Sequence, residues 1–513
     1  MTASKTSLKL AARPSHSYAV HALVVGLQAA GETPAVVTSG ELPQPTIEHL
    51  QRAVATLHLT GSAGQVVRLV GVPGVKAASV VLTGLGGDDG VGTGPGDGTG
   101  VEAGHEAVRR AAGAALRLLV GTAGSVVVDL PCPSPAALGA VAEGAYAGCY
   151  RYERRATGPG IATVTVASGC GRRADARGAV ARAEVLGRRR ALVRDLVNTP
   201  ANLLTPATFV TRVRQESRSA SAGLTGGKLA VTVLDERALA RLHCGGILGV
   251  GQGSANPPRI VELAWRPATA RASVALVGKG VTFDSGGLRI KPIDSMVVEK
   301  ADMAGAATVM GAVLAAADLA IPVAVTAWLC LAENMIDGNC QRPGDVVTMH
   351  NGMTVEILDP DAEGRMCLAD GMALACERRP DALVDIATLT GMQVTALGRR
   401  IAGLMGTDEG LRDRVLDAAQ RSGEPMWVMP LPHDERPSLD TPMADIAHKA
   451  EAQGGMLSAG LFLAEFVAEG TAWAHIDMAG PGYNPKAAYG HTGTGATGFG
   501  LATLLRLIES YAA

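Results

Sequence analysis

Aromatic residues are scarce in this sequence of 513 residues, in which Phe, Trp and Tyr together make up 3%. Hydrophobic residues nevertheless reach 47%, and there are 65 glycines. This much apolar material excludes general disorder, but the core that it forms must be aliphatic and rich in alanine. The length exceeds what one core usually supports, so we expect two domains, with three as an alternative.

The sequence also lacks paired cysteines, long apolar runs and an excess of charge. None of its eight cysteines forms a CxxC pair, which is typical of reduced thiols, so we expect a cytoplasmic protein. No uncharged apolar run reaches about 18 residues and the polar N-terminus does not read as a signal peptide, so we expect no membrane span. The net charge of −2 makes nucleic acid an unlikely partner in our interpretation.

The two parts of the chain differ in pattern. Residues 1–180 contain short strand-like segments, one clear helical pattern at 102–119, and a Gly/Asp-rich stretch at 84–100 that we interpret as a surface loop. Residues 181–513 alternate strand and helix patterns. The sequence therefore predicts an α/β protein with a smaller N-terminal α/β domain and a larger C-terminal catalytic domain, built on a mixed central sheet flanked by helices.

A glycine-rich turn after an apolar strand carries Lys279 and Asp284. In open α/β sheets, ligands bind at the carboxyl ends of strands, so both side chains would face a cleft. A lysine in a surface loop is the alternative. Asp302 precedes an apolar helix, where it would either cap the helix or point into the same site.

A third acidic segment follows the strand pattern at 354–358. In an extended chain, the side chains of Asp361, Glu363 and Arg365 would project to one side. Two carboxylates on one side repel each other, so a cation must offset them. That cation is either Arg365, in a structural network of ion pairs, or a pair of divalent metal ions.

Together these segments predict a metal centre of carboxylates and lysine. Hard oxygen ligands suit Zn²⁺, Mn²⁺ or Mg²⁺, and four carboxylates would balance two divalent cations. A lysine can ligate only as the neutral amine, so the ions would have to lower its pKa. His475 and Asp477 are an alternative metal pair, although the neighbouring Trp473 favours a structural strand.

The order and spacing of several motifs resemble the leucyl aminopeptidases of the cytosolic type, from about Asp195 to the C-terminus. The motifs are Val197–Asn202, Gly249–Ser254, Val277–Gly287, Glu333–Met335, Asp361–Arg365, Ala387–Gly391, Trp473–Gly480 and Gly495–Gly498. This resemblance implies a metalloexopeptidase that removes N-terminal amino acids from peptides by means of a water activated between two metals.

The resemblance also implies a role for each matching residue. Lys279, Asp284, Asp302 and Glu363 would hold one ion, and Asp284, Asp361 and Glu363 would hold a second, exchangeable one. The ions would be Zn²⁺ or Mn²⁺, with Mg²⁺ as an alternative.

Two further residues would take part in the reaction. Lys291 would stabilise the developing negative charge, and Arg365 would position a bicarbonate-like anion that carries the proton. The partners implied are peptides with a free N-terminus, and the assembly implied is a homohexamer of two stacked trimers.

Three features depart from the family pattern. Asp359-Pro360 precedes the ligand segment where the family usually has Asn-Thr, and His448 stands where asparagine is common. Glu299 stands where a methionine commonly lines the first substrate pocket, so we expect a shift from leucine towards basic or small N-terminal residues.

Two other functions stay open at this point. One is a tailoring peptidase or amidase that uses the same site on one specific peptide. The other is a non-catalytic hexameric assembly or DNA-binding protein. The complete set of ligands favours an enzyme, because a scaffold has no need for Lys279.

Overall fold

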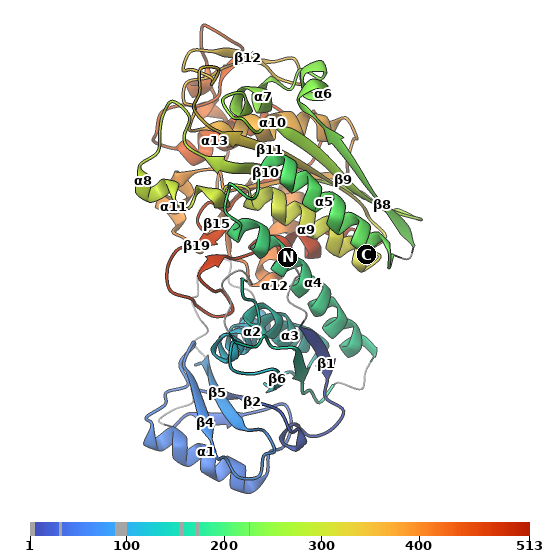
Figure 1. The fold of residues 1–513 in the computed structure, drawn as a ribbon, viewed down its shortest axis with the longest axis vertical. Coiled ribbons are helices and arrows are strands. Elements are labelled where there is room, and N and C mark those ends of the chain that lie inside the picture. Colours follow the sequence, from blue (N-terminus) through green and yellow to red (C-terminus); the bar gives the residue numbers. More distant parts are fainter. Residues whose placement is uncertain are drawn as a thin grey trace. The chain divides into compact units, whose positions relative to one another are not determined.

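The computed structural model describes residues 6–29, 33–87, 100–152, 158–170, 174–224 and 226–512. The chain divides into two compact units, residues 1–192 with 484–495, and residues 193–483 with 496–513 (Figure 1). The helix α4 (Ala174–Asn198) contains both the predicted boundary at residue 180 and the last residue of the first segment. Most of the predicted Gly/Asp-rich loop, residues 88–99, lies outside the described residues.

The first unit is a sheet of seven strands covered on both faces. The strands are β1 (Ser7–Leu10), β2 (Ala22–Gln28), β3 (Ala35–Val37), β4 (Val66–Val70), β5 (Ser79–Gly86), β6 (Ser125–Asp129) and β7 (Thr163–Val166). Their order is β1-β7-β6-β2-β5-β4, with β3 paired to β2. The chain is parallel along this order except at β4, which is antiparallel to β5.

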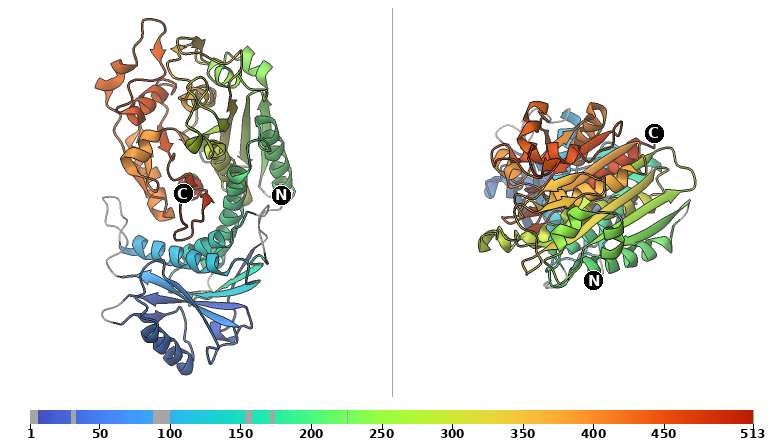
Figure 2. Two further views of the ribbon diagram at one scale, coloured as in Figure 1. Left: turned by 60° about the vertical axis from the view of Figure 1, so that its left-hand side comes forward. Right: turned by 90° about the horizontal axis from the view of Figure 1, so that it is seen from above.

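Alternating side chains explain why helices cover both faces of this sheet. In β2, Ala22 and Val24 belong to a core shared with α2 (Gly100–Leu119) and α3 (Pro135–Gly148), whereas Leu23 and Val25 belong to a core shared with α1 (Gln44–Thr56). Figure 2 shows the sheet lying between these two sets of helices. The first unit is therefore a three-layer α/β/α arrangement.

The second unit is built on an eight-stranded mixed sheet. Its strands are β8 (Gly227–Leu234), β9 (Arg259–Pro267), β10 (Ser273–Asp284), β11 (Ala324–Asn334), β14 (Ala382–Ala387), β15 (Ala402–Gly406), β16 (Met426–Val428) and β18 (Trp473–Asp477). The order is β16-β15-β18-β14-β10-β11-β9-β8. The central strands β11, β10, β14 and β18 are parallel, and β9 and β15 join them antiparallel.

Helices flank this sheet on both faces, with α9 (Ala304–Asp318) on one and α10 (Glu363–Cys376) on the other. A Cβ at Gly278 would lie 2.6 Å from Cα of Ala306 in α9. A Cβ at Gly364 of α10 would lie 2.4 Å from Cε of the next residue of β10, Lys279. Successive residues of β10 thus face opposite helices. The predicted fold class is confirmed.

Other helices and short strands complete the second unit. The helices are α5 (Pro206–Ser221), α6 (Glu236–Arg241), α7 (Gly245–Gly251), α8 (Ile293–Met296), α11 (Gly391–Leu397), α12 (Glu409–Ser422), α13 (Gly455–Ala464), α14 (Leu501–Ser510) and the 3-10 turns η3 (Glu299–Ala301) and η4 (His433–Leu439). The strands β12 (Val346–Thr348), β13 (Thr354–Glu356) and β17 (Ile446–Ala447) form a small separate sheet.

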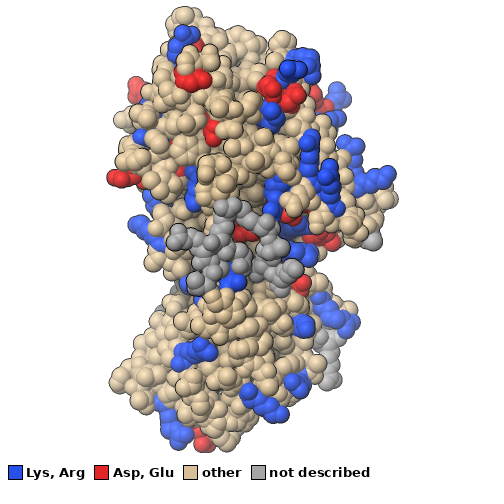
Figure 3. Space-filling model, viewed as in Figure 1, with Lys and Arg blue, Asp and Glu red and all other residues tan. Residues whose placement is uncertain are grey.

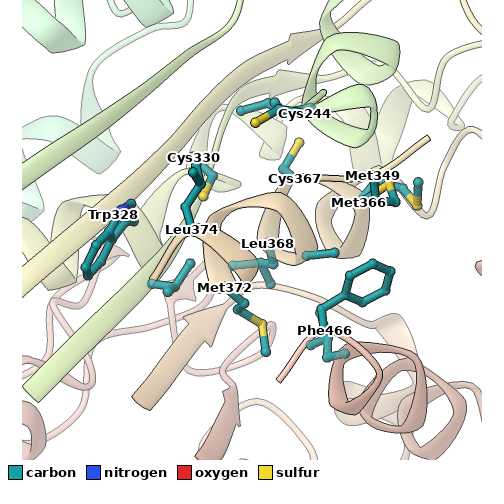
Figure 4. Close-up of a cluster of buried hydrophobic side chains, with 14 of the residues drawn as sticks. Cys244, Trp328, Cys330, Met349, Met366, Cys367, Leu368, Met372, Leu374 and Phe466 are labelled. Carbon is teal, nitrogen blue, oxygen red and sulfur yellow. The ribbon is translucent and has the colours of Figure 1, made fainter. Parts of the chain in front are cut away.

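The core around α10 is mostly aliphatic and sulfur-containing, and it also holds the aromatic side chains of Trp328, Phe462, Phe466 and Trp473. Figure 4 shows Cys367 of α10 directed towards Cys244, and Met372 on the opposite side of the same helix. All eight cysteines are free and six are buried, as the sequence predicts. Burial raises the pKa of the Cys330 and Cys367 thiols, so these groups act as small apolar side chains.

One stretch among the described residues, Glu299–Asp318, is long and apolar enough to cross a membrane. It comprises η3 and α9, and 94% of its most apolar window is buried inside the fold. This burial identifies the stretch as a core helix.

Candidate metal centre

The strand β10 brings Lys279 and Asp284 to the centre of the sheet. Lys279 is 3% exposed and Asp284 is 2% exposed. Between Val281 and Asp284 the register of β10 against β11 shifts, a bulge that changes the direction of the side chain that follows. The predicted glycine-rich turn around Lys279 is wrong, because β10 continues to Asp284 and Lys279 pairs in register with Cys330 of β11. Only Asp284 lies at the carboxyl end of this buried parallel strand.

Asp302 lies at the junction between η3 and α9. It ends η3, and the residue that caps α9 is Met303, which makes no side-chain capping bond. The capping role considered for Asp302 is therefore wrong. Its Oδ1 accepts a hydrogen bond of 2.7 Å from Thr388 Oγ1, and its buried Oδ2 has no hydrogen-bond partner among the described residues.

The prediction that Asp361, Glu363 and Arg365 alternate along an extended chain is also wrong. Helix α10 begins at Glu363, and the turn before it is closed by the N–H of Ala362, which donates to Asp359 O at 2.9 Å. Asp361 and Glu363 thus approach each other because a turn leads directly into a helix. In the sequence, a short acidic segment before an apolar run is compatible both with an extended chain and with a turn that leads into a helix.

Two lysines link the four carboxylates. Lys279 Nζ lies 2.7 Å from Asp302 Oδ1 and 2.8 Å from Glu363 Oε1. Lys291 Nζ lies 2.8 Å from Asp284 Oδ2 and 2.7 Å from Asp361 Oδ1. The five predicted ligands and Lys291 therefore converge on one site, from β10, the loop after it, η3 and the start of α10.

Arg365 does not neutralise these acids. Its Nη1 donates to the carbonyl of His448 at 2.9 Å, and no ion pair joins it to Asp361 or Glu363 among the described residues. It is 5% exposed, and its buried Nε has no hydrogen-bond partner there. Burial lowers the pKa of Arg365 to about 10.

The electrostatics of the site show an excess of negative charge. Burial raises the pKa of Asp302, and burial together with Glu363 raises that of Asp284 to about 7. Burial would lower the pKa of Lys279, but the surrounding carboxylates outweigh burial and raise it. The lysines in turn lower the pKa of Glu363 although burial opposes them. Further cations would stabilise this group of acids.

The arrangement of oxygens fits two divalent ions. Carboxylate oxygens of Asp284, Asp361 and Glu363 lie within 4.8 Å of one another, and so do those of Asp284, Asp302 and Glu299. Oxygen ligands lie about 2.1 Å from an ion such as Zn²⁺, so either group could surround one ion. Asp284 belongs to both groups, and Asp302 Oδ2 is a buried oxygen that no described residue contacts by a hydrogen bond.

Two supporting residues were missed by reasoning from the sequence. Asn334, at the end of β11, donates from Nδ2 to Asp284 Oδ1 at 2.7 Å and to Pro360 O at 3.0 Å. Thr388, after β14, accepts a hydrogen bond of 2.9 Å from Lys279 Nζ at its carbonyl. Asn334 ends β11 and Thr388 directly follows β14, and both strands are parallel neighbours of β10. Polar residues at the carboxyl ends of neighbouring parallel strands are the signal by which both could have been found.

His475 and Asp477, the alternative metal pair, are each bound by a neighbouring side chain. His475 Nδ1 lies 2.5 Å from Asp385 Oδ1, and Asp477 accepts a hydrogen bond of 2.6 Å from Thr390 Oγ1. Trp473 Nε1 donates to the other oxygen of Asp385 at 2.8 Å. These residues form a buried polar network between β14 and β18, so the structural interpretation of this strand fits.

The departures from the family pattern lie directly beside the ligands. Asp359 is 5% exposed and pairs with Arg289 and Lys449, and its Oδ1 accepts the N–H of Asp361 at 3.0 Å. His448 Nε2 lies 2.9 Å from Asp359 O, and burial lowers the pKa of His448 to about 4. The ring of His448 is therefore neutral, and its Nε2–H donates to the carbonyl oxygen of Asp359. The carbonyl oxygen of His448 accepts the hydrogen bond from Arg365 Nη1.

Comparisons with known proteins identify the family of this chain. The family described as "Cytosol aminopeptidase family, catalytic domain" matches residues 191–505, and that family's N-terminal domain matches residues 24–157. Relatives named "Probable cytosol aminopeptidase" are 44% identical in Micrococcus luteus, covering 98% of both chains, and 43% identical in Streptomyces griseus, covering 99% of both.

Two solved structures are similar over nearly the whole chain. The bottromycin maturation enzyme BotP in complex with Mn is 36% identical, with a TM-score of 0.82, and the match covers 96% of this chain and 100% of BotP. A mutant of tomato leucine aminopeptidase is 28% identical, with a TM-score of 0.83, covering 99% of this chain and 97% of that one. The predicted resemblance is confirmed: this chain belongs to the cytosol aminopeptidase family.

Proposed function

We propose that this chain is a metal-dependent aminopeptidase that removes N-terminal amino acids from peptides at the site around Lys279 and Asp284. The observation that carries the proposal is the convergence of four carboxylates, three buried and one (Asp361) half-buried, on two lysines, with Asp284 common to both groups of oxygens. Lys279, Asp284, Asp302, Asp361 and Glu363 would hold two divalent ions. Such ions supply Lewis acidity and lower the pKa of bound water.

Removal of metal tests this function directly. We expect the protein to hydrolyse an aminoacyl anilide and to lose this activity in a chelator, with recovery after addition of Mn²⁺ or Zn²⁺. The same anilide with an acetylated amine should be inert, because an exopeptidase requires the free N-terminus. Full activity of the chelated protein would contradict the proposal.

Lys291 is the residue that we assign to stabilising negative charge as it develops on the substrate. Its side chain is 17% exposed, so it reaches both the acids and the solvent side of the site. We expect Lys291→Ala to lower kcat by about 10²–10³-fold, the usual effect of removing one such donor. Metal content, measured in parallel, should stay at the wild-type value, and a loss of metal would assign Lys291 a structural role.

Arg365 is the residue that we assign to holding a small anion, bicarbonate or one like it, for proton transfer. The support is a buried guanidinium with one N–H donor that no described residue accepts. The anion's carboxylate-like oxygens would match that planar donor group.

The family resemblance puts Glu299 where a methionine commonly lines the first substrate pocket, and the expected substrate preference rests on that position alone. We expect leucine to be a poorer substrate than basic or small N-terminal residues. A panel of Leu-, Arg-, Lys- and Gly-linked anilides, compared by kcat/KM, measures this. An undiminished preference for leucine would contradict the prediction.

A substrate-specific maturation peptidase is the second candidate. It is favoured by the similarity to BotP, a structure described as a bottromycin maturation enzyme. Broad hydrolysis of unrelated dipeptides would favour the general aminopeptidase, whereas activity confined to one long peptide would favour this second function.

We further propose a cytoplasmic homohexamer, by analogy with the family pattern, and a mass in solution would check the assembly. A DNA-binding role has little support. The formal net charge is −2, and on the face shown in Figure 3 basic side chains are dispersed, with acidic side chains among them.

A further inference from the structure

Glu299 lies on the same side of a 3-10 turn as the proposed ligand Asp302. The N–H of Asp302 donates to Glu299 O at 3.2 Å, which closes the turn η3. A 3-10 helix has three residues per turn, so side chains three apart stand above one another. The turn thus directs a second carboxylate towards the oxygens that surround Lys279.

The position of this carboxylate matches a metal ligand better than a partner for lysine. An oxygen of Glu299 lies within 4.8 Å of oxygens of both Asp284 and Asp302. Its nearest approach to Lys291 Nζ is 4.0 Å, whereas Asp284 and Asp361 contact that ammonium at 2.8 and 2.7 Å. Glu299 therefore forms no close ion pair with this cation.

A separate observation indicates that this group of three oxygens receives a ligand. Asp302 is 6% exposed, and its Oδ2 is buried without a hydrogen-bond partner among the described residues. A buried carboxylate oxygen that accepts nothing is costly unless a cation satisfies it. An ion between Asp284, Asp302 and Glu299 would do so.

We propose that Glu299 is a direct ligand of the ion held by Asp284 and Asp302, which makes five carboxylates at the metal centre in place of four. This inference rests on the proposed function, since it assigns a further ligand to the same site. An added oxygen donor raises the coordination number and favours Mn²⁺ or Mg²⁺ over Zn²⁺, which prefers four ligands.

Titration of the metal-stripped full-length protein with Mn²⁺ tests the assignment without using activity. In Glu299→Met, which offers no hard oxygen, we expect one of two binding events to weaken by about 10- to 100-fold and the other to keep its affinity. Glu299→Gln, which keeps a neutral oxygen, should fall between that variant and the wild type. Asp294→Asn removes an exposed carboxylate of α8 and should bind both ions as the wild type does.

The outcomes separate this inference from the proposed function. If the wild type binds two ions and Glu299→Met binds both equally well, Glu299 is not a ligand and the aminopeptidase assignment stands. If Glu299→Met binds both ions as the wild type does but loses kcat/KM only on Arg- and Lys-linked anilides, Glu299 instead contacts the side chain of the substrate. If the wild type itself binds no ion, the proposed function fails.

Discussion

An Asp284→Asn variant is expected to hold neither metal ion at native affinity and to lose at least about 10³-fold in kcat/KM for an aminoacyl anilide, more than removal of one charge-stabilising donor usually costs. Asp284 is the residue common to both groups of carboxylate oxygens, so a single substitution weakens both ion sites. The new amide oxygen can still accept the hydrogen bonds from Asn334 Nδ2 and the Gly286 N–H, so the fold should be retained.

Metal content after dialysis, measured by mass spectrometry beside the anilide assay, checks this expectation. Asp294→Asn is again the matched control, because it makes the same chemical change on an exposed residue. Two ions per chain in Asp284→Asn, with activity within tenfold of the wild type, would exclude Asp284 as a shared ligand.

A Lys279→Met variant is expected to be less stable than the wild type by about 3–5 kcal/mol when both are held in a chelator. Methionine fills similar space but leaves Asp302 and Glu363 buried without the ammonium that lies 2.7 and 2.8 Å from them. The free energy of unfolding from urea titrations measures the loss. The variant should also bind metal poorly, because it lacks one of the proposed ligands.

Lys228→Met provides the comparison for that experiment. Lys228 is an exposed residue of β8 in the same sheet, so its substitution should change the free energy of unfolding by less than about 0.5 kcal/mol. An equally small change in Lys279→Met would show that the buried lysine does not stabilise the acids.

The central part of the site could be predicted from the sequence because its signals are local. An apolar segment followed by glycines placed Asp284 at a strand end, and β10 ends there, although the strand runs through Lys279 where the glycines predicted a turn. The separate strand and helix patterns of the second half also predicted the mixed sheet. These signals depend only on the period of apolar residues and on the residues that break it.

The local conformation around the remaining ligands could not be predicted in the same way. The segment Asp361–Arg365 is too short for its period to distinguish an extended chain from the first turn of α10. Asp302 resembles a helix cap in sequence, whereas the structure gives that position to Met303. Asn334 and Thr388 support the ligands through contacts from other strands, which no single segment encodes.

The chain crosses between the two units three times, after residues 192, 483 and 495. The short return, residues 484–495, packs on α2: Arg117 Nε donates to Gly490 O at 2.9 Å, and a Cβ at Gly113 would lie 2.2 Å from Cβ of His491. Truncation at residue 192 would therefore leave this return segment in the shortened protein without its packing partner. Residues 485–488 of this mostly polar segment are already exposed, so a separately expressed catalytic half would carry it as a loop that has lost its contacts with α2.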